Sequence, residues 1–240
     1  MWLRLDHVIL RAADPVATLA ELSAAAGAPV LAEVEEVGGI ASGIARAGPV
    51  DIEVVKIGRE SPDRPHGYGV GFVADGDLGD AVTRLRELGY ATSAPARGIA
   101  GDRRWRAVQV RGLLPDPFPA PASTRPPGFM DRLAESAAGL LSRVPAVARA
   151  ATRKAGGSMV VLTDYEFDAA AWRASAGDGP EVLEVHIGAG DLRGAWSRLP
   201  LSDGGPALQV HDSGPPGVNR IVLAGAGEAF SIGDVAFERR

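Results

Sequence analysis

The sequence predicts an α+β fold made of repeated βαβββ units. A strand followed by a helix recurs three times, with the strands beginning near Leu5, Gly69 and Val182. Each helix follows an aspartate, and further strand-like segments follow the first and third helices. Repetition on this scale indicates units that pack against one another to complete a core. The helix-starting aspartates are Asp14, Asp77 and Asp191.

The first unit has the clearest signals. Residues 3–11 alternate as a half-buried strand does, which predicts that Leu5, His7, Ile9 and Arg11 share one face. Asp14 before Pro15 is a typical helix start, and Gly27 is a typical stop. Three further strands are predicted at 30–37, 40–46 and 50–57, broken by glycine-rich turns.

The chain divides into three predicted parts. Residues 1–112 hold units one and two, with a linker at 58–67, a helix at 77–88 and a strand through 105–110. Residues 113–157 form an insertion with a proline-rich stretch followed by an amphipathic helix. Residues 158–240 supply the last strand of unit two, at 159–165, and a third unit over 182–237 with a helix at 191–199.

Composition excludes several classes of function. The chain has 240 residues, no cysteine and a net charge of −5, so we expect no disulfide or thiolate metal site and no nucleic-acid partner. No apolar run is long enough to cross a membrane, and no signal-peptide pattern opens the chain. We therefore expect a cytoplasmic protein. No glycine-rich phosphate loop or nucleophile elbow is present.

The opening Leu5-Asp6-His7-Val8-Ile9-Leu10 and the closing Asp51-Ile52-Glu53-Val54-Val55 of unit one resemble the vicinal oxygen chelate superfamily, most closely its glyoxalase-like domain proteins. The segment Ala81–Gly89 and Arg104-Trp105-Arg106 are also similar. The resemblance covers residues 3–112 well and 158–237 loosely. It implies paired units whose curved mixed sheets surround a cup, as in glyoxalase, bleomycin-resistance and extradiol dioxygenase proteins.

The resemblance also implies metal ligands on the first and last strand of each unit. His7 and Glu53 occupy these positions in unit one, but counting back from Asp77 places Val70 in the corresponding position of unit two. The third unit offers Glu184 and His186. A site of His7, Glu53 and His186 or Glu184 would suit a divalent ion such as Zn, Ni, Mn or Fe, with Glu53 and Glu184 as catalytic carboxylates. It requires units one and three to face each other.

Each candidate also has a structural explanation. His7 could be a pocket histidine without a metal, and Glu53 could pair with an arginine. Glu184 and His186 could belong to a solvated strand face. Arg11, Trp105 and Arg106 are expected to line the ligand pocket, although an Arg-Trp-Arg strand often buries only its tryptophan. The insertion could be a surface helix, a lid over the cup, or a contact in a homodimer.

The sequence thus predicts a small-molecule binding protein. As an enzyme it would use a divalent metal for lyase, isomerase or dioxygenase chemistry, polarising a substrate oxygen. The alternative is a metal-free protein that binds or sequesters a small organic molecule, as resistance proteins do. A structural module that contacts a partner through the insertion is a third hypothesis. Neither a nucleic acid nor a membrane is expected as a partner.

Overall fold

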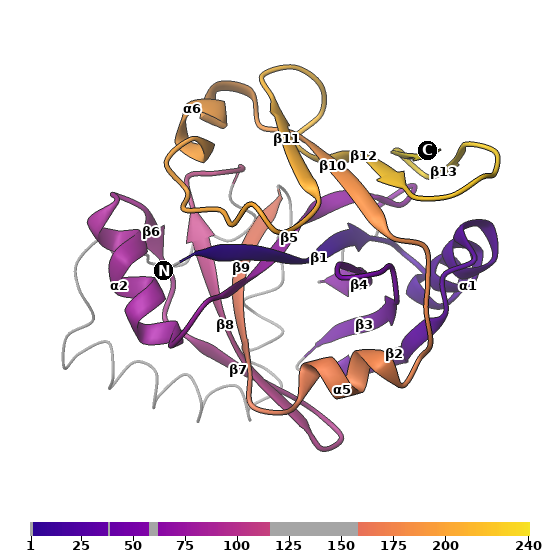
Figure 1. The fold of residues 1–240 in the computed structure, drawn as a ribbon, viewed down its shortest axis with the longest axis horizontal. Coiled ribbons are helices and arrows are strands. Elements are labelled where there is room, and N and C mark those ends of the chain that lie inside the picture. Colours follow the sequence, from indigo (N-terminus) through magenta and orange to yellow (C-terminus); the bar gives the residue numbers. More distant parts are fainter. Residues whose placement is uncertain (1, 38, 58–61, 116–157) are drawn as a thin grey trace.

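The computed structural model describes residues 2–37, 39–57, 62–115 and 158–240. Their main feature is a strongly curved sheet, in the order β2-β3-β4-β1-β5-β9-β8-β6, with β7 also paired to β8 (Figure 1). Its strands are β1 (Leu3–Arg11), β2 (Val30–Val37), β3 (Ile40–Ala45), β4 (Asp51–Ile57), β5 (His66–Ala74), β6 (Ala91–Thr92), β7 (Ala96–Ala100), β8 (Arg103–Arg111) and β9 (Met159–Tyr165). The concave face of this sheet is called the cup below.

The pairing at the centre of the sheet is that of two joined βαβββ units. β1 runs parallel to β4 and β5 runs parallel to β9, so the first and last strands of each unit are neighbours. The two first strands, β1 and β5, meet in an antiparallel pair. β9 therefore stands next to the first strand of unit two, although an insertion separates it from β8. The predicted fold class is confirmed.

The two ends of the curved sheet approach each other. Arg103 on β8 reaches Glu35 on β2, with Nη2 and Oε2 3.4 Å apart, and β7 lies in contact with β2. The short helix α5 (Ala169–Ala174) lies between these two ends of the sheet (Figure 1). The Arg103 guanidinium carbon lies over the Trp172 ring of this helix, 5.1 Å from the ring centroid. The sheet is thus nearly closed around the cup.

Two helices cover the convex face of the sheet. In α1 (Pro15–Ala26) the Asp14 side chain accepts a hydrogen bond from the Ala17 N–H, and Gly27 ends the helix at φ 69°. In α2 (Leu78–Glu87) the Asp77 side chain accepts from Gly79 and Asp80. Both predicted helices therefore form where their capping residues place them. Their buried apolar residues pack into the main core.

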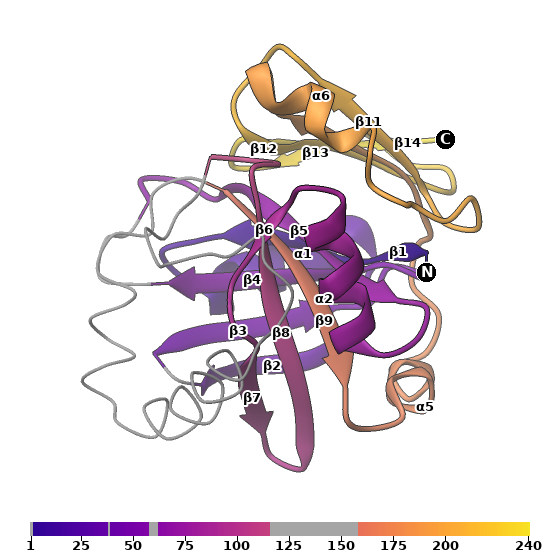
Figure 2. The ribbon, with the colours of Figure 1, turned by 90° about the vertical axis from the view of Figure 1, so that its left-hand side faces the viewer.

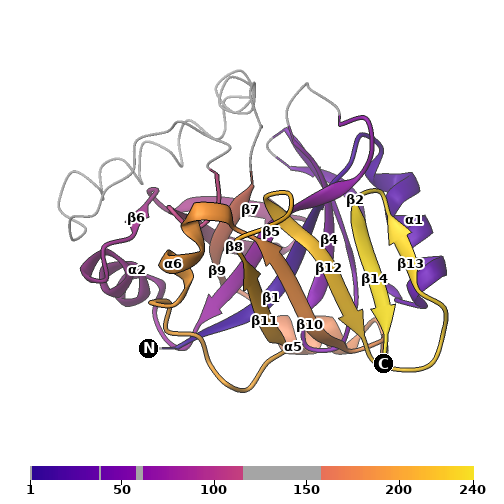
Figure 3. The same ribbon diagram turned by 90° about the horizontal axis from the view of Figure 1, so that it is seen from above.

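A second sheet packs on the outside of the first (Figures 2 and 3). Its strand order is β11-β10-β12-β14-β13. β11 and β10 are parallel, β10 and β12 are antiparallel, and β12 and β14 are parallel, as are the successive pairs of β4-β1-β5-β9 in the first sheet. β12 lies against β5, where a Cβ at Gly67 would meet the Val218 carbonyl oxygen at 1.7 Å. The strands are β10 (Val182–Gly188), β11 (Ala207–His211), β12 (Gly217–Leu223), β13 (Phe230–Ile232) and β14 (Val235–Arg239).

Several boundaries differ from the predicted ones. The third helix is reduced to a 3₁₀ turn, Gly190–Leu192, and one turn of helix, α6 (Arg193–Trp196). β5 begins inside the predicted linker, because the linker prolines end before His66. β7, α5 and β14 were not predicted. The predicted proline-rich stretch and amphipathic helix lie almost wholly outside the described residues. Their roles as a lid or as a dimer contact therefore stay predictions. Among the helices that the structure describes, none could span a membrane.

Candidate functional site

A bulge in β1 turns two polar residues into the cup. The β1–β5 register shifts between Leu5 and His7, so Asp6 is the extra residue. Leu5 therefore packs in the main core with Val8 and Leu10, on the convex side. The prediction that Leu5 shares a face with His7 was wrong, because strict alternation does not hold across a bulge.

His7 and Glu53 meet inside the cup. His7 Nε2 lies 3.6 Å from Glu53 Oε2, and Ser42 on β3 donates a hydrogen bond of 2.5 Å to Glu53 Oε1. The parallel pairing of β1 with β4 places Glu53 opposite Ile9, within reach of His7. The His7 side chain is only 11% exposed, whereas the Glu53 side chain is 23% exposed, so Glu53 is the more accessible member of the pair.

Asp6 orients His7 from the other side of the ring. Asp6 Oδ2 accepts hydrogen bonds from His7 Nδ1, at 2.9 Å, and from the Tyr165 hydroxyl, at 2.6 Å. Because an ionised carboxylate has no proton to give, the Nδ1 of His7 must hold one. The Nε2 atom therefore faces Glu53.

Arg173 of α5 joins two buried carboxylates. Its Nη2 donates to Asp6 Oδ1 and its Nε donates to Asp51 Oδ2, both at 2.6 Å. Asp51 is also approached by Arg46, with Nη1 3.4 Å from Oδ1. Both carboxylates are almost fully buried, so this arginine compensates charges that water cannot reach.

The polar groups shift one another's pKa values. Burial alone would raise the pKa of Asp6, but the hydrogen bond from His7 and the charges of His7 and Arg173 hold it well below its usual range. Burial alone would lower the pKa of His7, but the hydrogen bond to Asp6 and the negative charge of Glu53 raise it above 6.5. Burial, with the nearby Asp6 carboxylate, raises the pKa of Tyr165 well above 10.0. The arrangement favours an imidazolium between two carboxylates.

The rest of the cup near His7 is apolar. Ile9, Val55, Ile57 and Tyr68 form a buried cluster separate from the main core. Burial raises the pKa of Tyr68 to about 12, and its buried hydroxyl makes no hydrogen bond with any residue in the described ranges. A buried hydroxyl without a partner is costly and marks a place for a water or a ligand.

The structure separates the predicted pocket residues. Arg11 lies in the cup, where its guanidinium stands over the Tyr68 ring and donates to the Ile57 carbonyl. Trp105 is half-buried with its ring over Gly98. Arg106 shares the face of Val108, which packs in the main core, and its Nε donates to Asp164 at 3.0 Å. Arg106 therefore lies on the convex side and not with the other two.

The predicted third ligand does not join His7 and Glu53. Units one and two share the cup, while β10 belongs to the second sheet. There His186 Nε2 lies 3.0 Å from Glu184 Oε2, and His186 Nδ1 lies 2.9 Å from His211 Nε2. Within the described residues, no group of three or more His, Asp or Glu side chains could hold a metal ion. The site required units one and three to face each other, and this condition is not met, because the second sheet packs on the convex side of the first.

The described part of unit two places no metal ligand beside His7 and Glu53. Val70, the position found by counting, packs in the main core. Its neighbour Gly71 faces the cup beside the His7 ring, and Val161 on β9 packs against the apolar cluster. His7 and Glu53 remain the two available donors in this part of the described chain, because Asp6 and Asp51 are bound to Arg173. A catalytic metal ordinarily has three protein ligands, so this donor set fits one poorly.

Comparisons with known proteins agree on the architecture. No family model matches the sequence, and no curated protein is similar to it. Among solved structures, a hypothetical protein from Staphylococcus aureus has a TM-score of 0.63 at 8% identity, over 100% of this chain and 99% of that one. The two chains therefore share a fold, which says nothing of a shared activity.

Two enzymes are also among the matches, with lower scores. Methylmalonyl-CoA epimerase from Streptomyces coelicolor has a TM-score of 0.38 at 15% identity, over 67% of this chain and 92% of that one. The epimerase from Mycobacterium tuberculosis has a TM-score of 0.39 at 14% identity, over 70% and 91%. Scores this low carry no argument about the function of this chain.

Proposed function

We propose that this chain, which has the vicinal oxygen chelate fold, binds a small organic molecule in its cup through His7 and Glu53, without a resident metal. The observation that supports this most is the pair itself. An imidazole held by Asp6 faces an accessible carboxylate, and Gly71 of unit two, which lies beside the imidazole ring, has no side chain that could ligate a metal.

The ligand has a defined chemistry. The Nε2–H of His7 donates to an acceptor such as a carbonyl oxygen, and Glu53 accepts from a neighbouring N–H or O–H. Ile9, Val55 and Ile57 offer an apolar wall for the body of the molecule. The Tyr68 hydroxyl, which has no partner within the described ranges, offers one more polar contact. A small apolar molecule with a donor and an acceptor side by side satisfies all of these groups.

The same residues could also transfer a proton. A histidine whose pKa lies above 6.5 beside an ionised carboxylate forms an acid and base pair near neutral pH. In such a step the Nε2–H of His7 would give its proton to a ligand oxygen. Asp6 would stabilise the imidazolium that exists before this transfer, and His7 would be neutral afterwards.

The second candidate is the metal-assisted lyase, isomerase or dioxygenase. One observation favours it: a histidine that ligates a metal commonly donates its other N–H to a carboxylate, as His7 does to Asp6. His7 and Glu53 would hold the ion, which would polarise a substrate oxygen. The need for a third protein donor counts against this candidate.

Benzamide is a suitable probe, because its amide presents a carbonyl acceptor beside N–H donors on an apolar ring. We expect it to perturb the NMR signals of His7 and Tyr68 in the wild type, and ethylbenzene to do so far less. The variant H7A should lose the response, whereas E21Q, a change at an exposed carboxylate of α1, should keep it. Equal responses to both probes, or an unchanged response in H7A, would contradict the proposal.

A further inference from the structure

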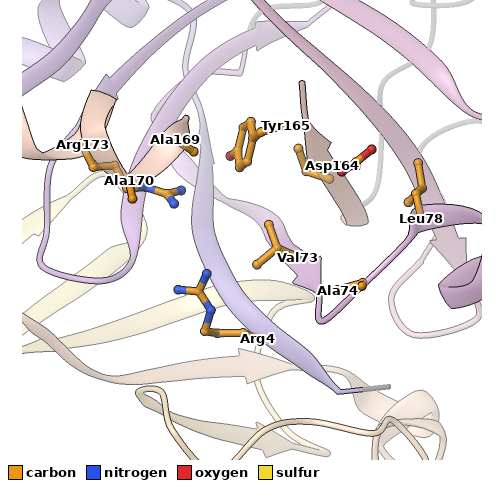
Figure 4. Close-up of a pocket in the computed structure, with 11 residues that line it drawn as sticks. Arg4, Val73, Ala74, Leu78, Asp164, Tyr165, Ala169, Ala170 and Arg173 are labelled. Atoms are coloured by element: carbon orange, nitrogen blue, oxygen red, sulfur yellow. The ribbon is translucent and has the colours of Figure 1, made fainter. Parts of the chain in front are cut away.

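A separate cavity lies behind the wall that Tyr165 and Arg173 form with Asp6. It has a volume of about 250 Å³ and is bounded by β1, β5, β9 and α5 (Figure 4). Tyr165 and Arg173 line it, while His7 and Glu53 do not. Its size is below the range of about 300–1,000 Å³ that drug-sized ligands occupy, so it suits a smaller molecule.

One charged group in this cavity has no partner among the described residues. Arg4 of β1 makes no hydrogen bond or ion pair with the rest of the described chain, and its guanidinium lies on the same side of the cavity as that of Arg173 (Figure 4). Arg173 is already bound to Asp6 and Asp51. Arg4 is therefore the cation that remains for a ligand.

The one carboxylate in the lining is already neutralised. Asp164 Oδ2 accepts hydrogen bonds from both Nε and Nη2 of Arg106, at 3.0 and 2.5 Å. Arg106 approaches from the convex side of β8, so it compensates Asp164 without entering the cavity. Among the residues that line the cavity, an incoming anion thus meets the positive charge of Arg4 without an unpaired carboxylate.

The remaining lining is mostly apolar. Val73 and Leu78 come from β5 and the start of α2, and Ala169 and Ala170 come from α5. In Figure 4 Leu78 lies on the side opposite the two arginines. The cavity therefore combines one fork-shaped cation with a short apolar surface.

We propose that this cavity binds a small monocarboxylate with a short apolar chain. The carboxylate would take two parallel hydrogen bonds from the Arg4 guanidinium, and the chain would lie on Val73 and Leu78. A single free guanidinium matches a single negative charge. This site is distinct from the His7 pair, and its occupancy does not depend on the function proposed for that pair.

Butanoate is the probe, with butanamide as its neutral counterpart. In NMR titrations of the intact protein, we expect butanoate to shift the amide signals of Val73, Gly76 and Ala169 with a Kd on the order of 1 mM, as few atoms can contribute. The R4Q variant should weaken binding about tenfold or more, because a charged donor is lost. R4K keeps the charge without the fork and should give an intermediate affinity.

Arg64, whose Nε lies 2.6 Å from Asp234, provides the matched control, and R64Q should bind butanoate as the wild type does. Arg4 is exposed and unpartnered within the described residues, so a folded R4Q protein is expected, and its spectrum will show this directly. The proposal is overturned if butanamide binds as tightly as butanoate, if R4Q binds like the wild type, or if the shifts map to His7 and Tyr68 instead.

Discussion

The His7 imidazole lies directly against Gly71. A Cβ atom at position 71 would stand 2.0 Å from His7 Cε1 and 2.2 Å from its Nε2, distances that no side chain could tolerate. β1 and β5 pair at these two residues, so the close approach is built into the register of the sheet. The His7 ring of unit one therefore fills the space that a metal-ligating side chain at position 71 of unit two would need.

A substitution at this glycine should displace the ring. We expect G71A to lower the free energy of unfolding by about 1–3 kcal/mol, the usual cost of overpacking, and to abolish the benzamide response. Gly204 has open space around it, and G204A should leave stability within about 0.5 kcal/mol of the wild type. Chemical denaturation measures both. A G71A protein as stable as G204A, with His7 signals unchanged, would show that the ring does not depend on this contact.

The Arg173 bridge should be essential for stability. Replacing it in R173M removes the guanidinium that Asp6 and Asp51 share and leaves only His7 beside the one and Arg46 beside the other, so we expect a loss of about 3–5 kcal/mol. R64Q removes an exposed ion pair and should cost at most about 1 kcal/mol. If urea denaturation gives the two variants similar stabilities, the carboxylates are not held ionised by Arg173.

The stability of the protein should depend on pH through His7. Because its pKa in the folded state is raised above 6.5, protonated His7 stabilises the fold below that pH, and this contribution is lost as pH rises through the folded-state pKa. The difference in unfolding free energy between wild type and H7Q should therefore shrink as the pH is raised.

His66 provides a control of opposite sign. Burial lowers its pKa below 6.5, so protonation favours the unfolded chain as the pH falls. The difference between wild type and H66Q should change with pH in the opposite direction to that for H7Q. Parallel curves for the two variants would contradict the assigned directions.

Local signals in the sequence were sufficient for α1, α2 and most strands. Asp14 and Asp77 cap their helices through contacts with residues two or three positions away, so a short window of sequence contains the whole cause. The strands of unit one likewise follow from alternation and glycine-rich turns. The convergence of His7 and Glu53 came from the resemblance, because it depends on β1 pairing with β4.

Long-range contacts were beyond this reasoning. The bulge at Asp6 arises from the pairing of β1 with β5, and alternation within β1 alone cannot show it. Arg173 comes from a segment 167 residues beyond Asp6, in a helix that was not predicted. No pattern in the sequence around Arg173 indicates that it binds Asp6 and Asp51. The same limit explains why His186 was grouped with His7, since their alternating patterns are similar but their sheets are different.

The most direct test of a metal-free cup is the NMR titration of the His7 imidazole, with and without equimolar Zn²⁺. We predict that its pKa lies above 6.5, that H186Q leaves the titration unchanged, and that Zn²⁺ does not alter it. If one equivalent of Zn²⁺ instead abolishes the protonation of His7 near neutral pH, and E53Q restores it, then His7 and Glu53 hold a metal and the central claim is wrong.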